Sequence, residues 1–378
     1  MKKLLLILLC FPMIGFGQGW ETTFGGIALE FGYSVQQTTD GGYILGAQTT
    51  NTVNANYDIY LIKTDGNGTE QWSQTYGDIE NEGGIAKQTT DGGYIIGGWK
   101  SFGNQQDYTF YLMKTDGNGI EQWNQTYAQG RGGSVQQTTD GGYIIAGRKD
   151  SLFLSGHTER DVYLIKTDGN GVEQWNQTFG GVNHDAGYSV HQTTDGGYII
   201  AGGSNSNMSV YLIKTDGSGA QQWSKTFGNY FDPQFPYYTQ QTTDGGYIIS
   251  GTWFDFDWTT GTGNRDIFLL KTDGNGDSLW TKTYGGVNDD VGSFVQQTTD
   301  GGYIIIGSKG TGSSDSDVYL IKTDGNGNVT STFNIPINPN RKLEKTVDIL
   351  GKETIPQINT PFIEIYDDGT VEKKIIIE

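Results

Sequence analysis

The sequence predicts an all-β protein whose six similar repeats form the four-stranded blades of a six-bladed β-propeller. The motif Gln-Thr-Thr-Asp-Gly-Gly-Tyr occurs six times, with its aspartates 49 to 56 residues apart, at Asp40, Asp91, Asp140, Asp195, Asp244 and Asp300. A second motif, Lys-Thr-Asp-Gly-(Asn/Ser)-Gly, follows each copy of the first. A period of this length is typical of propellers and other repeat arrays.

Each repeat reads as four strands, here called a to d. In the third repeat they are residues 133–138, 143–146, 161–166 and 172–179. β-Branched and aromatic residues dominate these runs, and helical periodicity is absent from them. The glycines of the two motifs suit tight a–b and c–d turns. These turns hardly vary, so we expect the variable b–c and d–a loops to form the functional face.

A tryptophan recurs seven residues after the aspartate of the second motif. We interpret these residues as packing between blades: Trp72, Trp123, Trp175, Trp223 and Trp280. The sixth repeat has Ser331 there, but residues 20–26, beginning with Trp20, match residues 175–181. We therefore expect the N-terminal strand to complete the last blade and close the ring, which removes open sheet edges.

The predicted organisation has three parts. Residues 1–17 read as a secretory signal peptide, in which Lys2 and Lys3 precede an apolar run that is too short to span a bilayer. Residues 18–335 form the propeller, and residues 336–378 a short C-terminal β tail. The net charge of −19 disfavours nucleic acid and anionic membranes as partners. We expect a secreted chain, extracellular or on the outer cell surface, without a transmembrane span.

Candidate ligand-binding residues gather in the variable loops, where aromatic residues stand beside carboxylates. Such groups suit stacking on a sugar or peptide, with the carboxylates accepting hydrogen bonds. Packing of the same rings into a small loop core is the alternative. The candidates are Trp99, Tyr230, Asp232, Trp253, Phe254, Asp255, Phe256, Asp257 and Trp258.

The leading hypothesis is a non-catalytic binding or adhesion propeller whose extracellular ligand is a glycan or a protein segment. The alternatives are a secreted glycan-degrading enzyme that uses the same face, and a scaffold without a small ligand. No catalytic residue, metal or cofactor is predicted. His157, His184 and His191 lack metal-ligand spacing, and the Asp-Gly-Asn-Gly turns lack the later ligands of a calcium loop.

The sequence also bears three resemblances to known families. The Asp-Gly-Asn-Gly-x-x-x-Trp segment resembles the blade motif of quinoprotein-dehydrogenase-like propellers, which implies fold alone. The whole repeat resembles secreted propeller-like repeat proteins of Bacteroidetes. Residues 347–353 and 366–377 resemble the C-terminal sorting domain of the type IX secretion system, which implies the secretion machinery as a partner. A small β appendage is the alternative for this tail.

Overall fold

The computed structural model confirms the all-β class. Its described residues contain 25 strands and no helix. The chain divides into two units, Met1–Asn328 and Val329–Glu378. The structure describes residues 22–25, 28–50, 56–77, 80–102, 107–152, 158–181, 184–204, 209–228, 234–257, 262–310, 316–329, 342–348, 352–357, 360, 362–366 and 371–374.

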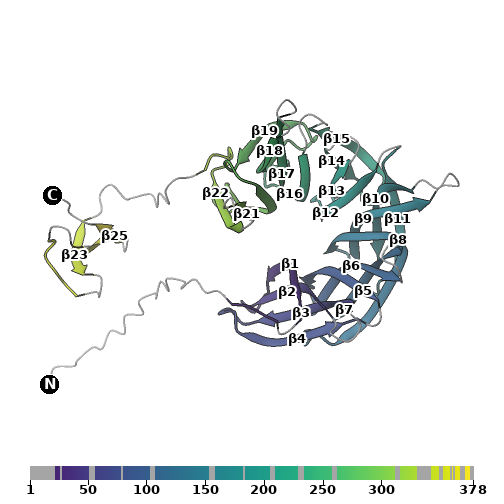
Figure 1. Cartoon of the computed structure of the whole chain (residues 1–378), viewed down its shortest axis with the longest axis horizontal. Helices are drawn as coiled ribbons and strands as arrows, with labels where there is room; N and C mark the ends of the chain where they lie inside the picture. The colour runs from purple at the N-terminus through teal and green to yellow at the C-terminus, as the bar shows by residue number, and fades with distance from the viewer. Residues whose placement is uncertain are drawn as a thin grey trace, which may run out of the picture. The chain divides into compact units, whose positions relative to one another are not determined.

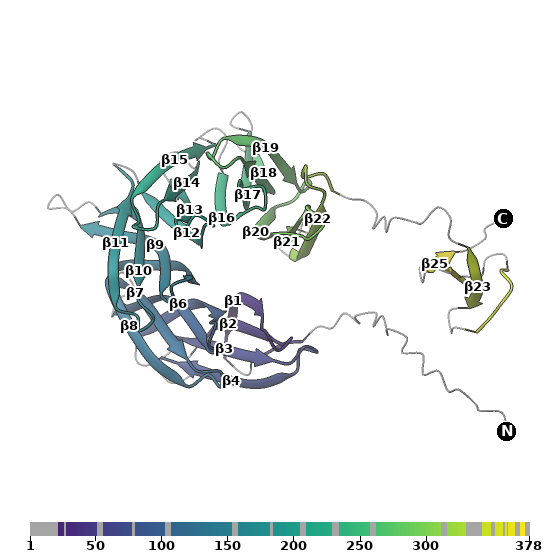
Figure 2. The same ribbon diagram turned by 180° about the vertical axis from the view of Figure 1, so that it is seen from behind.

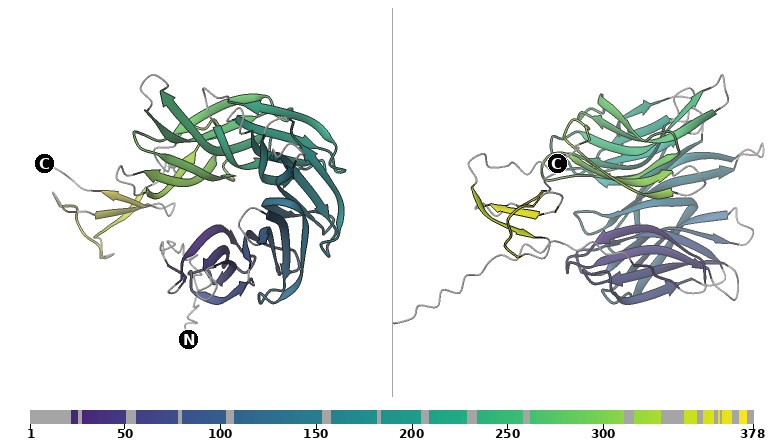
Figure 3. Two further views of the ribbon diagram at one scale, coloured as in Figure 1. Left: turned by 45° about the vertical axis from the view of Figure 1, so that its right-hand side comes forward. Right: turned by 60° about the vertical axis from the view of Figure 1, so that its left-hand side comes forward.

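Three of the repeats each form a separate four-stranded antiparallel sheet, with the strands in sequence order (Figure 1). The first repeat contains β1 (Glu30–Gln37), β2 (Tyr43–Thr50), β3 (Tyr57–Thr64) and β4 (Glu70–Tyr76). The fourth contains β12 (Asp185–Gln192), β13 (Tyr198–Ser204), β14 (Ser209–Thr215) and β15 (Gln221–Phe227). The fifth contains β16 (Gln234–Gln241), β17 (Tyr247–Asp257), β18 (Thr262–Thr272) and β19 (Ser278–Tyr284). Figure 3 shows that these sheets are strongly twisted, as expected for β structure.

The second and third repeats share one seven-stranded sheet. It contains β5 (Asn81–Gln88), β6 (Tyr94–Phe102), β7 (Asp107–Thr115), β8 (Glu121–Gln137), β9 (Tyr143–Leu152), β10 (Thr158–Thr167) and β11 (Glu173–Phe179). Only 17 residues separate Trp123 from Asp140, whereas 20 separate Trp175 from Asp195. The shorter connection leaves no room for a d–a loop, so the continuous strand β8 serves both repeats.

The sixth repeat forms a three-stranded sheet from β20 (Asp290–Gln297), β21 (Tyr303–Gly310) and β22 (Ser316–Thr323). The structure does not confirm six uniform four-stranded blades or a closed ring. Residues 22–25 lie outside any strand, and Trp20 lies outside the described residues. Figures 1 and 2 show the sheets of the first unit following one another, with the first and last apart.

Adjacent repeats pack through the recurring tryptophans. The Trp175 ring centroid lies 5.8 Å from that of Tyr198 in the next repeat, and Trp72, Trp123, Trp223 and Trp280 make the same contact with the corresponding tyrosine. Gly219 adopts a φ of +83°, and a Cβ there would lie 2.5 Å from the Trp175 ring. Glycine is therefore required twice at this turn, for its backbone conformation and for the close approach.

The a–b and c–d turns lie at the same end of each repeat because its antiparallel strands follow one another in sequence order, and a lysine joins the two turns. Lys166 Nζ lies 2.9 Å from Asp140 Oδ2, and the Thr138 hydroxyl donates to Asp140 Oδ1 at 2.5 Å. Burial raises the pKa of Asp140, but the hydrogen bonds from Thr138, Lys166 and Gly142 outweigh it and lower the pKa to about 2. The same ion pair recurs in the other repeats, at Lys63, Lys114, Lys214, Lys271 and Lys322.

The second unit is a three-stranded antiparallel sheet of β23 (Leu343–Asp348), β24 (Phe362–Tyr366) and β25 (Val371–Lys374). Val347 and Phe362 are buried in it. The tail predicted as residues 336–378 falls within this unit. Among the described residues of the whole chain, no helix is long and apolar enough to cross a membrane.

Candidate functional site

A cavity of about 300 Å³ opens between strands of the first four repeats. Its side chains come from the halves of the strands that lie away from the Asp-Gly-Gly turns. The lining residues are Tyr33 of β1; Gly84 and Ile85 of β5; Gly97 and Trp99 of β6; Arg131, Gly132 and Gly133 of β8; Arg148 of β9; and Ala186, Gly187 and Tyr188 of β12. The glycines reflect close packing around the cavity, since a Cβ on Gly84, Gly97 or Gly132 would lie within 2.8 Å of a neighbouring residue.

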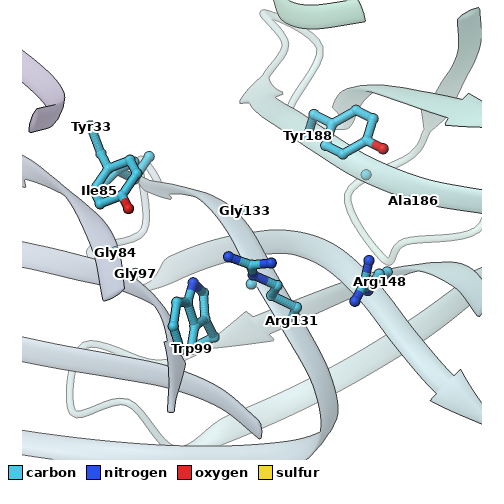
Figure 4. A pocket seen from close by; sticks show the side chains of 12 residues that line it. Tyr33, Gly84, Ile85, Gly97, Trp99, Arg131, Gly133, Arg148, Ala186 and Tyr188 are labelled. Carbon is cyan, nitrogen blue, oxygen red and sulfur yellow. The ribbon is translucent and has the colours of Figure 1, made fainter. Parts of the chain in front are cut away.

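Arg131 lies against two aromatic rings at one side of this cavity, and Figure 4 shows it beside Trp99. Its guanidinium carbon lies 4.7 Å from the Trp99 ring centroid and 5.3 Å from that of Tyr108. Trp99 and Tyr108 meet edge to face, with centroids 5.1 Å apart. Cation–π contacts of this kind hold a guanidinium in place while its N–H groups keep their capacity to donate.

Arg148 stands directly across the strand pair from Arg131, because β8 and β9 align these two residues in register. Arg148 Nε lies 3.6 Å from Asp150 Oδ1, and Arg160 Nε lies 3.3 Å from the same oxygen. Burial lowers the pKa of Arg148, the charges of Arg160 and Arg131 lower it further, and Asp150 opposes them. One carboxylate is thus shared by two arginines.

Two tyrosines complete the aromatic part of the cavity, Tyr33 and Tyr188 (Figure 4). The Tyr33 hydroxyl donates to Gln48 Oε1 at 2.5 Å, and Gln48 Nε2 donates to the backbone oxygen of Glu82 at 2.5 Å. Burial raises the pKa of Tyr188 and of Tyr33, although a nearby arginine opposes the shift in each case. Both phenols therefore stay protonated at neutral pH, and the single donor of Tyr33 is already given to Gln48.

The structure places the two described tryptophans of the candidate set on opposite faces of their sheets. Trp99 lies five residues after the first tyrosine of its strand, Tyr94, whereas Trp253 lies six after Tyr247. Successive strand residues point to opposite faces. Trp99 therefore lines the cavity, whereas Trp253 packs against the buried cluster that contains Phe268.

The loop expected in the fifth repeat is largely a hairpin, because β17 and β18 stay paired as far as Asp257 and Thr262. Phe254 lies in β17, with its ring centroid 6.0 Å from the guanidinium carbon of Arg265. The backbones of Asp255, Phe256 and Asp257 also lie in β17, and their side chains are outside the described set. Tyr230, Asp232 and Trp258 lie wholly outside the described residues.

Sequence reasoning missed Arg131, Arg148, Tyr33 and Tyr188. All four lie in strands. The predicted strand bounds left Arg131 and Arg148 in the variable loops, but the search there was for aromatic residues beside carboxylates. Arg131 had one usable signal, since it follows the shortened connection between the second and third repeats. A bulge between Gly132 and Ser134 then decides its partner, because the register shift brings Arg131 opposite Arg148.

A second group missed by sequence reasoning is the carboxyl pair Asp161 and Asp185, at the boundary of the third and fourth repeats. A Cβ on Gly180 would lie 2.1 Å from Asp161 Oδ1 and 3.0 Å from Asp185 Oδ2, so both face this glycine. Burial raises the pKa of both carboxyl groups, and the charge of Asp185 adds to the rise at Asp161. Asp266 and Asp290 flank Gly285 in the same way two repeats later, which indicates a structural origin in the repeat.

The cavity is suited to binding by its chemistry. Two guanidinium groups, one indole and two phenols line it, and none of its lining residues is a carboxylate. Most glycosidases use two carboxyl groups at the scissile bond. In the part of the chain that the structure describes, no group of three or more His, Cys, Asp or Glu side chains could hold a metal ion.

No protein-family profile matches the chain, and no curated protein matches it. Solved structures are similar to it only distantly. The β-propeller domain of the Trilobed protease from Pyrococcus furiosus has 8% identity and a TM-score of 0.45, covering 94% of this chain and 97% of its own. A mutant of puromycin hydrolase has 11% identity and a TM-score of 0.40, covering 89% of this chain and 58% of its own. A glycosyl hydrolase from Bacteroides ovatus has 9% identity and a TM-score of 0.39, covering 79% of this chain and 86% of its own. The chain thus spans little more than half the length of the puromycin hydrolase.

Proposed function

We propose that this chain is an extracellular, non-catalytic binding protein whose ligand enters the cavity around Trp99. The observation that carries this proposal is an open cavity lined by aromatic rings and hydrogen-bond donors and by no carboxylate. Its volume is at the lower end of the range of about 300–1,000 Å³ typical of ligand sites. A sugar ring or a short peptide segment fits such a site, because one face can stack on an aromatic ring while polar edges accept hydrogen bonds.

The Trp99→Ala variant should bind its ligand more weakly by about 1–3 kcal/mol, by analogy with the stacking of aromatic side chains on bases. Glycan and peptide arrays with the purified chain would identify a ligand, and calorimetry would then compare the variants. Trp253→Ala is the matched control, since Trp253 packs on the core and not in the cavity. If Trp253→Ala weakened binding and Trp99→Ala had no effect, the binding site would lie in the fifth repeat, which would contradict the proposal.

A glycan-degrading enzyme is the second candidate, favoured by the raised pKa of Asp161 and Asp185. A carboxyl group with a raised pKa can act as a general acid, and Asp185 directly precedes the cavity residue Ala186. The same glycans incubated with the protein separate the two candidates. Release of reducing sugar that disappears in Asp185→Asn would establish the enzyme, and intact glycans support the binding protein.

We also propose that the C-terminal residues direct export to the cell surface through a type IX machinery. The proposal rests on the sorting-like motifs at residues 347–353 and 366–377, and these residues belong to a separate unit. A chain without residues 341–378 should remain inside the outer membrane of a host that has this machinery. Immunodetection on intact cells measures this, and surface delivery of the truncated chain would contradict the proposal.

A further inference from the structure

The unusual feature of the cavity is a pair of like charges. Arg131 and Arg148 face each other directly across neighbouring strands, β8 and β9. Side chains in such cross-strand positions have Cβ atoms about 4.5–5.5 Å apart, and like charges there destabilise a sheet. The chain as a whole carries a charge of −19. Two arginines side by side therefore contrast with its acidic composition.

The neighbouring carboxylates neutralise this pair only in part. Asp150 lies 3.6 Å from Arg148 and also serves Arg160. Among the described residues, no carboxylate forms an ion pair with Arg131, and no residue that lines the cavity is acidic. The aromatic contacts with Trp99 and Tyr108 fix the position of the Arg131 guanidinium but leave its donors unmatched. The site therefore holds a surplus of positive charge and of N–H donors.

A planar guanidinium held in this way matches a carboxylate, because two parallel N–H groups can donate to its two oxygens. The cavity also offers flat aromatic surfaces from Trp99, Tyr33 and Tyr188 within the same opening. A sugar that carries a carboxylate satisfies both features, since its ring stacks while its carboxylate meets the arginines. Resting on the binding function proposed above, we infer that the ligand is an acidic glycan that contains uronic acid residues.

The test uses the full mature chain and a panel of uronate oligosaccharides, each paired with its carboxyl-reduced neutral counterpart of the same length and linkage. Calorimetric titration should show at least one acidic member bound about tenfold or more tightly than its neutral partner, as expected for a charged hydrogen bond. Arg131→Gln should abolish most of this preference. Arg131→Lys should restore only part of it, since lysine keeps the charge but loses the paired donors.

Arg265→Gln is the matched control, because Arg265 also contacts an aromatic ring, that of Phe254, but lies outside the cavity. The preference of this variant for acidic over neutral oligosaccharides should equal that of the native chain. Thermal melting should show that each variant is folded. Equal binding of acidic and neutral partners would overturn the acidic ligand while leaving the binding function intact. A chain that binds no glycan but binds peptides with a free C-terminal carboxylate through Arg131 would also overturn the inference. The ligand would then be a peptide.

Discussion

The Trp175→Ala variant is expected to lose about 3–5 kcal/mol of the free energy of unfolding, the usual cost of removing a large aromatic side chain from a packed site. Trp175 contacts Tyr198 of the next repeat and packs against the cluster of buried residues that contains Val162 and Val190. The turn at Gly219 comes too close to the ring for any side chain. No neighbour can refill the space without moving a strand, so a cavity between repeats would remain.

Urea denaturation followed by circular dichroism measures this loss. Leu279→Ala is the matched control, since Leu279 lies in the corresponding strand of the fifth repeat but is 59% exposed, and its unfolding free energy should change little. A loss below about 1 kcal/mol for Trp175→Ala would show that the tryptophans do not hold the repeats together.

The second large effect is expected from deleting residues 18–26. The first and last repeats expose apolar positions that are covered elsewhere. Val35 is 67% exposed, whereas Val135, Val190 and Val295 are fully buried. At the other end, Leu320 of β22 is 63% exposed. These two surfaces are the unmatched halves of an interface that recurs between all the inner repeats.

The hydrogen bonds between inner repeats indicate how the first and last repeats would align if the ring closes. At each inner boundary, a glutamine side chain accepts from a threonine N–H of the preceding repeat, for example Thr139 N to Gln192 Oε1 at 2.9 Å. Gln37 has the position of this glutamine in the first repeat, and its side chain donates to Gly41 of its own turn at 3.4 Å. We propose that in the closed state Gln37 meets the backbone of Thr299 and that residues 19–24 pair with β22.

The deletion should lower the melting temperature by at least as much as Trp175→Ala, because it removes Trp20 and the proposed pairing of residues 19–24 with β22. The transition followed by calorimetry should also broaden, since the end repeats would open separately. A chain without residues 341–378 is the matched control, because that segment lies in the second unit. An unchanged transition after deletion of residues 18–26 would show that the ring does not close in this way.

Local sequence was sufficient for the repeat and its turns. Asp140 and Gly142 specify a hairpin through short-range hydrogen bonds. The tryptophan at a fixed offset likewise predicted a large ring at one strand position in five of the six repeats. These features depend on neighbours within a few residues or on strict repetition, so each could be read without knowing the fold.

The cavity required the tertiary structure. A one-residue bulge beside Gly133 decides that Arg131 stands opposite Arg148, and such a register shift changes which side chains meet without leaving a clear mark in the sequence. The difference of one position between Trp99 and Trp253 decides that one ring lines the cavity while the other packs on the core. Strand alternation turns a single residue of offset into opposite faces, and therefore the aromatic residues of the sequence could not by themselves locate the site.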